Sequence, residues 1–155
     1  MVLRPPGAGT GARKIVEHMR VSVERGIEGD RWYEEERDLP FHQVSLVNIH
    51  VLESLAGEDP QRCALSGDNL QVDLDLTEAN LPAGTQLSIG SAVLEVSPPP
   101  HIPCGKFHER YGVKAVKKVL RANKKGRRGR GVICTVRVAG EFQLGDRICV
   151  KRTSG

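Results

Sequence analysis

Residues 85–97 read T-Q-L-S-I-G-S-A-V-L-E-V-S, and this stretch decides the fold class. Apolar and polar side chains alternate on both sides of Gly90-Ser91, as they do in half-buried strands. A two-residue connection that contains glycine, placed between two alternating runs, is typical of a β-hairpin. The stretch therefore predicts two neighbouring antiparallel strands.

Similar alternation extends outward from this hairpin along the chain. It predicts further strands in residues 15–23, 43–47, 69–76, 132–138 and 148–150. The polar residues 32–40 predict a surface loop instead. About seven short strands joined by glycine-rich turns are typical of a barrel or a folded sandwich. Closing the sheet into a barrel also removes exposed strand edges. We therefore expect a mainly β protein of the barrel type with a few short helices.

The pattern predicts two helices. The first is expected to begin after Asn48, a good N-cap, and to end at Gly57. The second is expected over residues 113–122. Its apolar face would consist of Val113, Val116, Val119 and Leu120.

The size and composition of the chain are those of one soluble domain. It has 155 residues, of which 39% are hydrophobic and 27% are charged. We expect a single domain over residues 1–155, with an irregular N-terminal segment at residues 1–13. No stretch approaches the roughly 18 apolar residues of a membrane span, and the N-terminus lacks the apolar region of a secretory signal. A cytoplasmic protein without membrane partners is therefore expected.

Cys104 is the strongest candidate for a reactive residue. It stands in S-P-P-P-H-I-P-C-G-K, residues 97–106, where the prolines stiffen the backbone. His101, Lys106 and His108 supply positive charge that favours a thiolate. The alternative is a buried, inert cysteine. A structural role is expected for the other three cysteines, Cys63, Cys134 and Cys149. The sequence contains no CxxC pair, which argues against a zinc ribbon or an iron–sulfur cluster.

A metal site formed by His101, Cys104 and His108 is a weaker alternative. The three residues have the spacing of one helical face, but Pro100 and Pro103 oppose a helix through this stretch. A zinc site would also need a fourth ligand or an open water position.

A basic run follows, without an acidic residue inside it. Three interpretations stay open: nucleic-acid binding, a solvated helix face, or a cationic rim that attracts an anionic small molecule. Aromatic residues that could stack on bases are absent from the run, which disfavours nucleic acid. The run consists of Lys114, Lys117, Lys118, Arg121, Lys124, Lys125, Arg127, Arg128 and Arg130.

Taken in order, several short motifs resemble the MOSC family, named for the C-terminal domain of molybdenum cofactor sulfurases. The resemblance covers about residues 26–150. The motifs are Gly26-Ile27-Glu28-Gly29-Asp30-Arg31, Gln43-Val44-Ser45-Leu46, Gly67-Asp68-Asn69-Leu70, Leu81-Pro82-Ala83-Gly84-Thr85, Ile89-Gly90, Leu94-Glu95-Val96, Pro103-Cys104, Gly129-Arg130-Gly131-Val132 and Gly145-Asp146.

The resemblance implies a MOSC-type β-barrel and a cysteine that handles sulfur or the molybdenum of a pterin cofactor. That cysteine matches Cys104, which is expected to be both the catalytic residue and the metal ligand. The phosphate of the molybdenum cofactor (molybdopterin) needs basic donors, and Arg62, Lys106 and Arg130 are the candidates. Asn69 is expected to hydrogen-bond the pterin edge.

Stand-alone family members resemble reductases that remove N-hydroxyl groups from base analogues. The fused members follow a pyridoxal-phosphate-dependent desulfurase domain, which this chain lacks. We therefore expect a molybdenum-dependent reductase of N-hydroxylated small molecules, supplied with electrons by a partner protein because no dinucleotide fingerprint is present. The alternative is a sulfur or cofactor carrier that takes a Cys104 persulfide from a sulfur donor. A basic nucleic-acid-binding module is the third possibility.

Overall fold

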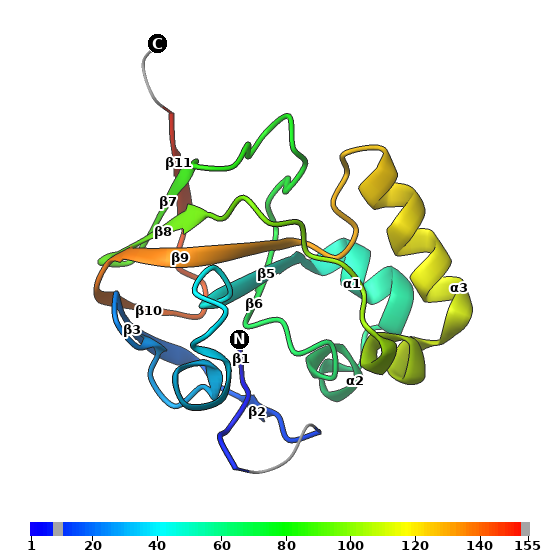
Figure 1. Cartoon of the computed structure of the whole chain (residues 1–155), viewed down its shortest axis with the longest axis horizontal. Helices are drawn as coiled ribbons and strands as arrows, with labels where there is room; N and C mark the ends of the chain where they lie inside the picture. Colours follow the sequence, from blue (N-terminus) through cyan, green and yellow to red (C-terminus); the bar gives the residue numbers. More distant parts are fainter. Residues whose placement is uncertain (8–10, 153–155) are drawn as a thin grey trace.

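In the computed structural model, which describes residues 1–7 and 11–152, one curled six-stranded sheet dominates the molecule (Figure 1). Its strand order is β11-β7-β8-β9-β5-β6, and its neighbours are antiparallel except for the parallel pair of β5 and β6. The strands are β5 (Val44–Asn48), β6 (Leu70–Val72), β7 (Gln86–Ile89), β8 (Ala92–Val96), β9 (Val132–Val138) and β11 (Ile148–Lys151). The hairpin predicted from residues 85–97 is confirmed as β7 and β8, with Ile89 opposite Ala92.

Two smaller sheets complete the strands. The first has the order β10-β3-β4, and the second consists of β1 and β2. Their strands are β1 (Val2–Leu3), β2 (Lys14–Ile15), β3 (His18–Ser22), β4 (Gly26–Ile27) and β10 (Gly140–Gln143). Met19 and Phe142 from the three-stranded sheet share one buried cluster with Leu46, Leu94 and Val136 of the large sheet. Both sheets therefore enclose the same aliphatic core, and the expected mainly β, barrel-type fold is confirmed.

Three details of the strand prediction are wrong. Residues 15–23 are split between β2 and β3; Met19 and Val21 are buried in the core and Val16 packs against it, whereas Ile15 and Val23 are exposed. Within residues 69–76, only β6 pairs with a neighbour. The N-terminal segment 1–13, expected to be irregular, contains β1; its residues 8–10 lie outside the described part of the chain.

The first predicted helix is confirmed as α1 (Ile49–Ala56). The Asn48 side chain accepts hydrogen bonds from the backbone N–H groups of His50 and Val51, and the helix ends at Gly57. The short helix α2 (Pro60–Ala64) follows, capped by Asp59. Residues 32–40 do not form the predicted loop throughout, because Trp32–Glu36 is the π-helix η1. Burial of the Trp32 ring, whose Nε1 donates to the Leu39 carbonyl at 3.0 Å, accounts for this order.

The second predicted helix is longer than expected, and its predicted apolar face is half right, since Val119 is buried and Val116 is partly buried against the second cluster. Helix α3 spans Gly105–Lys124, with a kink at Gly112, whose φ of 85° and ψ of 172° are not helical. Its buried side chains are Phe107, Tyr111, Ala115 and Val119, which pack with α1 and α2 in a second cluster. Val113 and Leu120, predicted to be buried, are 52% and 48% exposed. Figure 1 shows α3 at the outer edge of the molecule beside α1.

In the part of the chain that the structure describes, no helix has the length and apolar character needed to cross a membrane. The longest helix, α3, carries basic side chains along its exposed side.

Candidate functional site

Cys104 lies at the N-cap position of α3, directly after Pro103, and its side chain is exposed. The helix starts here because the proline before it cannot continue a helix toward the N-terminus. Cys63 and Cys134 are buried; burial is the main cause that raises the pKa of both thiols, that of Cys134 to about 12. Cys149 on β11 is the other exposed cysteine of the described residues. Exposure therefore separates Cys104 and Cys149 from the two inert thiols.

Cys104 borders a cavity of about 200 Å³. Parts of the chain that are distant in sequence meet there: the N-terminal segment, η1 and the loop after it, the loop after α2, and the start of α3. The cavity is basic, because six cationic side chains line it, whereas the acids around it are Glu36 in the lining and the buried Asp30 and Asp68 behind it. The six cations are Arg4, Arg13, Arg31, Lys106, Arg110 and Arg130.

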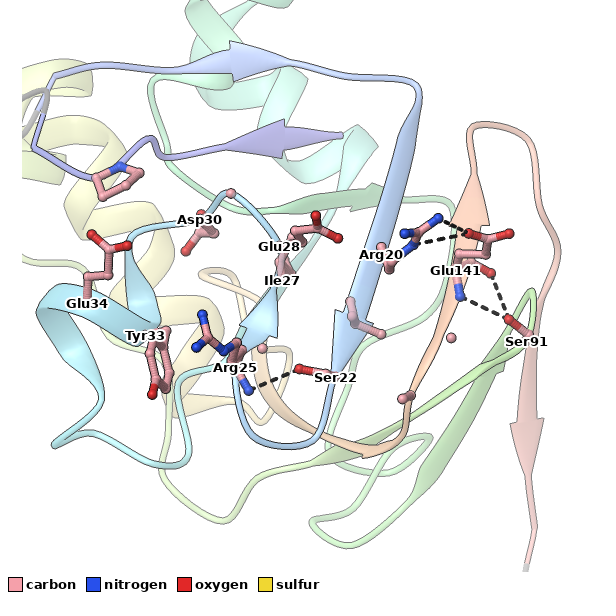
Figure 2. Close-up of a pocket in the computed structure, with 16 residues that line it drawn as sticks. Arg20, Ser22, Arg25, Ile27, Glu28, Asp30, Tyr33, Glu34, Ser91 and Glu141 are labelled. Atoms are coloured by element: carbon pink, nitrogen blue, oxygen red, sulfur yellow. Dashed lines mark hydrogen bonds and ion pairs between the residues drawn. The ribbon is translucent and has the colours of Figure 1, made fainter.

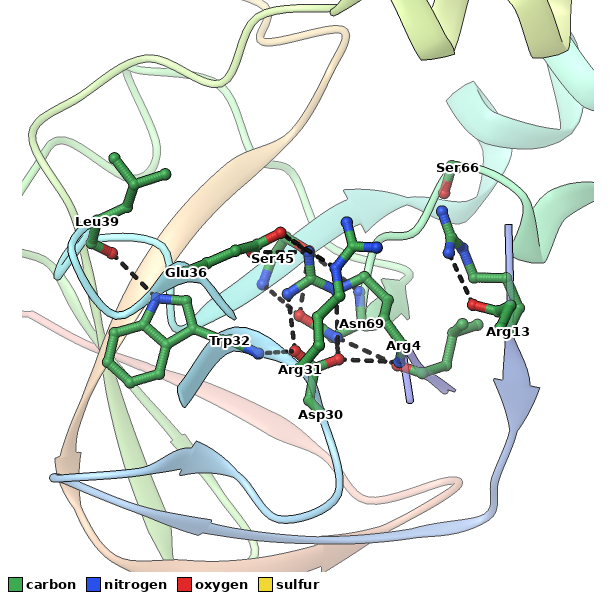
Figure 3. Close-up of polar contacts among 12 residues, drawn as sticks. Arg4, Arg13, Asp30, Arg31, Trp32, Glu36, Leu39, Ser45, Ser66 and Asn69 are labelled. Carbon is green, nitrogen blue, oxygen red and sulfur yellow. Dashed lines mark hydrogen bonds and ion pairs between the residues drawn. The ribbon is translucent and has the colours of Figure 1, made fainter. Parts of the chain in front are cut away.

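Asp30 anchors one wall of this cavity (Figure 3). It forms an ion pair of 2.7 Å with Arg4 and accepts hydrogen bonds from the backbone N–H groups of Arg4 and Trp32. Arg4 and Arg31 share Glu36, each at 3.1 Å. Burial disfavours the charged form of Arg4, but Asp30 and Glu36 outweigh that effect and raise its pKa. The network fixes Arg4, which comes from the N-terminal segment, against the turn after β4.

His101 and Arg130 form the floor of the cavity, and the fully buried Asp68 lies behind them in the same cluster. Arg130 Nη1 donates to Asp68 Oδ2, and Nη2 donates to the Ser66 carbonyl at 3.0 Å. His101 Nδ1 lies 3.8 Å from Asp68 Oδ1. Burial, followed by the charge of Arg130, lowers the pKa of His101 to about 3, so its ring is neutral at pH 7.

Three buried atoms of this cluster have no hydrogen-bond partner among residues 1–7 and 11–152: Asp68 Oδ1, His101 Nδ1 and Arg130 Nε. Buried polar atoms are nearly always paired, with protein, water or a ligand. The cluster therefore has spare hydrogen-bonding capacity where the cavity is most enclosed.

A close backbone contact places Arg130 beneath the cavity. A Cβ atom on Gly131, whose φ is +85°, would lie 1.9 Å from the Leu46 carbonyl oxygen. Only glycine therefore allows the start of β9 to approach β5 so closely. The guanidinium carbon of Arg130 then lies 5.0 Å from the centre of the Phe107 ring, at the first turn of α3. This packing joins the sheet to the helix that begins at Cys104.

Arg13 lies among other cations of the cavity. Burial lowers its pKa to about 10, and repulsion by Arg110, Arg31 and Arg4 adds to the effect. A cavity whose cations repel one another in this way would be stabilised by an anion, because charge-assisted hydrogen bonds would replace the repulsion.

The structure brings together three of the predicted site residues. Cys104, Lys106 and Arg130 all line the cavity. Arg62 does not; it is exposed on α2, with its guanidinium carbon 5.7 Å from the centre of the Tyr111 ring. Asn69 is 1% exposed and its amide is used internally, since Oδ1 accepts from the Ser45 backbone and Nδ2 donates to Val2 and Asp30.

The alternative metal site does not form. Among the described residues, no group of three or more His, Cys, Asp or Glu side chains is placed to hold a metal ion. Pro103 ends the extended segment and α3 begins only at Gly105, so His101, Cys104 and His108 do not share a helical face.

A larger hollow of about 730 Å³ lies away from the cysteines, over the outer side of β3 and β4 (Figure 2). Arg20 and Glu141, opposite each other on β3 and β10, form an ion pair of 3.2 Å at its edge, and the Arg25 guanidinium carbon lies 4.6 Å from the centre of the Tyr33 ring. Two arginines and four acids line the hollow, and it has no thiol. The exposed thiol and the excess of cations occur together at the smaller cavity instead.

The curled β-sheet core and the basic cavity beside an exposed cysteine define a β-barrel-like protein with a thiol at a cation-lined cavity. The chain belongs to the MOSC family: the family model described as "MOSC domain" matches residues 19–149.

Solved structures agree with this fold. The YuaD protein from Bacillus subtilis superposes with a TM-score of 0.67 at 19% identity, over 95% of this chain and 91% of that one. YiiM from Escherichia coli gives a TM-score of 0.61 at 21% identity, and the match covers 99% of this chain and 70% of YiiM. A third structure, described as a hypothetical protein, gives 0.65 at 19% identity; this chain spans 66% of its length. A comparison with curated proteins gives no match.

Proposed function

We propose that this protein binds molybdenum cofactor through Cys104 and reduces N-hydroxylated small molecules with electrons from a partner protein. MOSC domains bind this cofactor in related proteins. The observation that carries the proposal is the position of Cys104, an exposed thiol bordering a cavity lined by six cations and one acid.

The residues present fit the anionic end of the cofactor. Its phosphate needs several charge-assisted donors, and Arg31, Lys106 and Arg130 provide them from three sides of the cavity. The spare donor Arg130 Nε is already oriented within the buried floor. About 200 Å³ is less than a whole-ligand pocket usually occupies, so the enclosed part would take the phosphate end. Cys104 would stand at the exposed rim.

The cofactor, when bound, supplies a metal that exchanges two electrons. The thiolate of Cys104 is a soft ligand suited to such a metal. The reaction breaks the N–O bond of R–NHOH with two electrons and two protons, and yields R–NH₂ and water. The neutral His101 can hold a hydrogen bond at Nδ1 near the cavity floor, while Arg4 and Arg31 keep that wall in place. In the cytoplasm, where thiols stay reduced, Cys104 would remain available.

The test is metal and pterin analysis of protein made in a host that synthesises the cofactor. The wild type and a Cys149→Ser control are expected to retain molybdenum and pterin, whereas Cys104→Ser is expected to lose the metal. Turnover of an N-hydroxylated substrate with a reductase donor should follow the metal content. Equal molybdenum in Cys104→Ser and the wild type would contradict the proposed ligand.

The carrier alternative rests on the same exposed thiol and predicts a different product. A sulfur carrier would show a mass increase of one sulfur atom on Cys104 after incubation with a sulfur donor, without turnover of N-hydroxylated compounds. Finding that product in metal-free protein, and no reductase activity in the metal-loaded form, would favour the carrier over the reductase.

A further inference from the structure

The basic run identified in the sequence divides into two groups with different environments. Arg128 and Arg130 point inward: Arg128 donates to the Leu81 carbonyl, and Arg130 is buried against Asp68. The other members are exposed on the second half of α3 and just beyond it. Of these, Arg127 lies beyond the turn that follows the helix, and we refer to the other six, Lys114, Lys117, Lys118, Arg121, Lys124 and Lys125, as the basic face.

The basic face has no compensating acid within the described residues. None of its six cations forms a salt bridge with residues 1–7 or 11–152; Lys118 Nζ donates instead to the Ser54 hydroxyl at 2.9 Å. Cations three and four positions apart on a helix repel one another and weaken it slightly. The opposite side, with Ala115 and Val119, packs into the second core cluster and holds the helix in place. The fold therefore maintains a concentrated positive surface that local energetics disfavour.

Two apolar side chains border this surface. Val113 and Leu120 are 52% and 48% exposed, and they are seven positions apart, so they lie on the same side of the helix. Lys117 and Lys124 lie between and beside them at helical spacing. The surface thus combines a row of cations with a small apolar edge.

We propose that the basic face, together with Val113 and Leu120, docks a partner protein whose surface is acidic and carries apolar side chains. Charge complementarity requires an anionic partner, and the apolar edge provides the apolar contacts typical of a protein interface. Phosphate groups offer no partner for Val113 and Leu120, and the aromatic residues of α3, Phe107 and Tyr111, are buried, so bases have nothing to stack on. The proposal stands independently of the cofactor chemistry.

An anionic membrane surface fits less well than a protein. An interfacial helix inserts its whole apolar face into the lipid. In α3 that face is occupied by Ala115 and Val119 packed against α1 and α2, and only two apolar residues remain outside.

The experiment measures fluorescence anisotropy of labelled probes titrated with the purified full chain. The probe is a synthetic 20-residue helical peptide with acidic residues and leucines at i and i+7. An all-acidic peptide of equal charge without leucine, a 20-base-pair DNA duplex and vesicles containing phosphatidylserine serve as comparisons. The variants are Lys117→Glu/Lys124→Glu and Val113→Ser/Leu120→Ser. Lys14→Glu/Lys151→Glu changes two exposed lysines elsewhere by the same net charge. Circular dichroism verifies that each variant is folded.

The Lys117→Glu/Lys124→Glu variant is expected to weaken binding of the leucine-containing peptide about tenfold, whereas the control variant Lys14→Glu/Lys151→Glu should weaken it less than about twofold. The Val113→Ser/Leu120→Ser variant is expected to weaken that peptide about fivefold and to leave the all-acidic peptide unchanged. Equal losses of peptide affinity in the Lys117→Glu/Lys124→Glu variant and in the control variant would overturn the proposal. So would tighter binding of the duplex or the vesicles than of the peptide, with no effect of Val113→Ser/Leu120→Ser.

Discussion

His101 Nδ1 lies 3.8 Å from Asp68 Oδ1, and neither atom has a hydrogen-bond partner in the described part of the chain. Both atoms are buried in the floor of the basic cavity. A neutral ring is retained there because burial and the charge of Arg130 lower the pKa of His101 to about 3. A buried acid therefore faces a histidine that resists protonation, and this has a measurable consequence.

Stability should fall with decreasing pH because of His101. Below its ordinary pKa of 6.5 the unfolded chain binds a proton at His101, whereas the folded chain does not until about pH 3. The stabilisation is therefore complete above about pH 6.5 and is lost progressively as the pH falls toward 3. Between pH 7 and pH 5 the free energy of unfolding should drop by about 2 kcal/mol more in the wild type than in His101→Gln. Urea unfolding at both pH values measures the difference; parallel losses in the two proteins would contradict it.

Alkylation should distinguish the two exposed cysteines by charge. The cations near Cys104 attract an anionic reagent, whereas Cys149 lies on β11 outside the basic cavity. We expect iodoacetate to favour Cys104 over Cys149 more strongly than neutral iodoacetamide does, with the extra preference lost at about 1 M salt. Mass-spectrometric peptide mapping measures the ratios. Buried Cys63 and Cys134 should react last with both reagents, and identical ratios for both reagents would contradict the electrostatic effect.

Anion affinity should depend on Lys106 and not on Arg62. Lys106 lines the cavity and is exposed, so Lys106→Gln should weaken binding of inorganic phosphate by about 1.5 kcal/mol, roughly tenfold. Arg62→Gln removes one positive charge on α2, outside the cavity, and serves as the matched control. Isothermal titration calorimetry measures both. A comparable loss in Arg62→Gln would show that Arg62 also takes part in the anion site, as the family resemblance implied.

Asp30 should be important for stability. Its side chain is fully buried and holds Arg4, the Trp32 backbone and Asn69. Asp30→Asn leaves Arg4 without its closest counter-charge, and we expect a loss of about 3 kcal/mol in the free energy of unfolding. Glu28→Gln, in the same turn but exposed, should change stability by less than about 0.5 kcal/mol. Urea denaturation of both variants gives the comparison, and equal stability of Asp30→Asn and the wild type would refute the role.

Alternation predicted the hairpin and β9 correctly, but it overextended the strands in residues 15–23 and 69–76, where pairing with a neighbour covers only part of the alternating stretch. The hairpin of β7 and β8 was predicted because successive side chains of a strand point to opposite faces, so that apolar and polar residues alternate in its sequence. The buried face of α3 was predicted only in part. Val116 and Val119 pack against the second cluster as expected, but the pattern missed Ala115 and placed the exposed Val113 and Leu120 on that face, because the neighbouring helices decide which side is covered. Burial of the Trp32 ring orders the otherwise polar segment Trp32–Glu36 as η1, and a count of polar residues cannot predict this.

The cavity residues were predicted where a local motif surrounds them. Cys104, Lys106 and Arg130 belong to such motifs and line the cavity. Arg4 and Arg13 come from a segment whose composition indicates only irregular chain, before residue 19 where the family match begins. Their place depends on the pairing of β1 with β2 and on Asp30, 26 residues further on. Long-range pairing of this kind leaves no periodic signal.

The kink at Gly112 divides α3 into a first part that borders the cavity and a second part that carries the basic face. The seven residues before it hold Lys106 and Arg110 at the cavity and Phe107 against Arg130, whereas the twelve residues after it present the basic face. A substitution on the outer half therefore alters the surface without passing strain to the cysteine end. Relatives could exchange that surface freely, and with it the molecules they meet, while keeping the cavity and its cysteine unchanged.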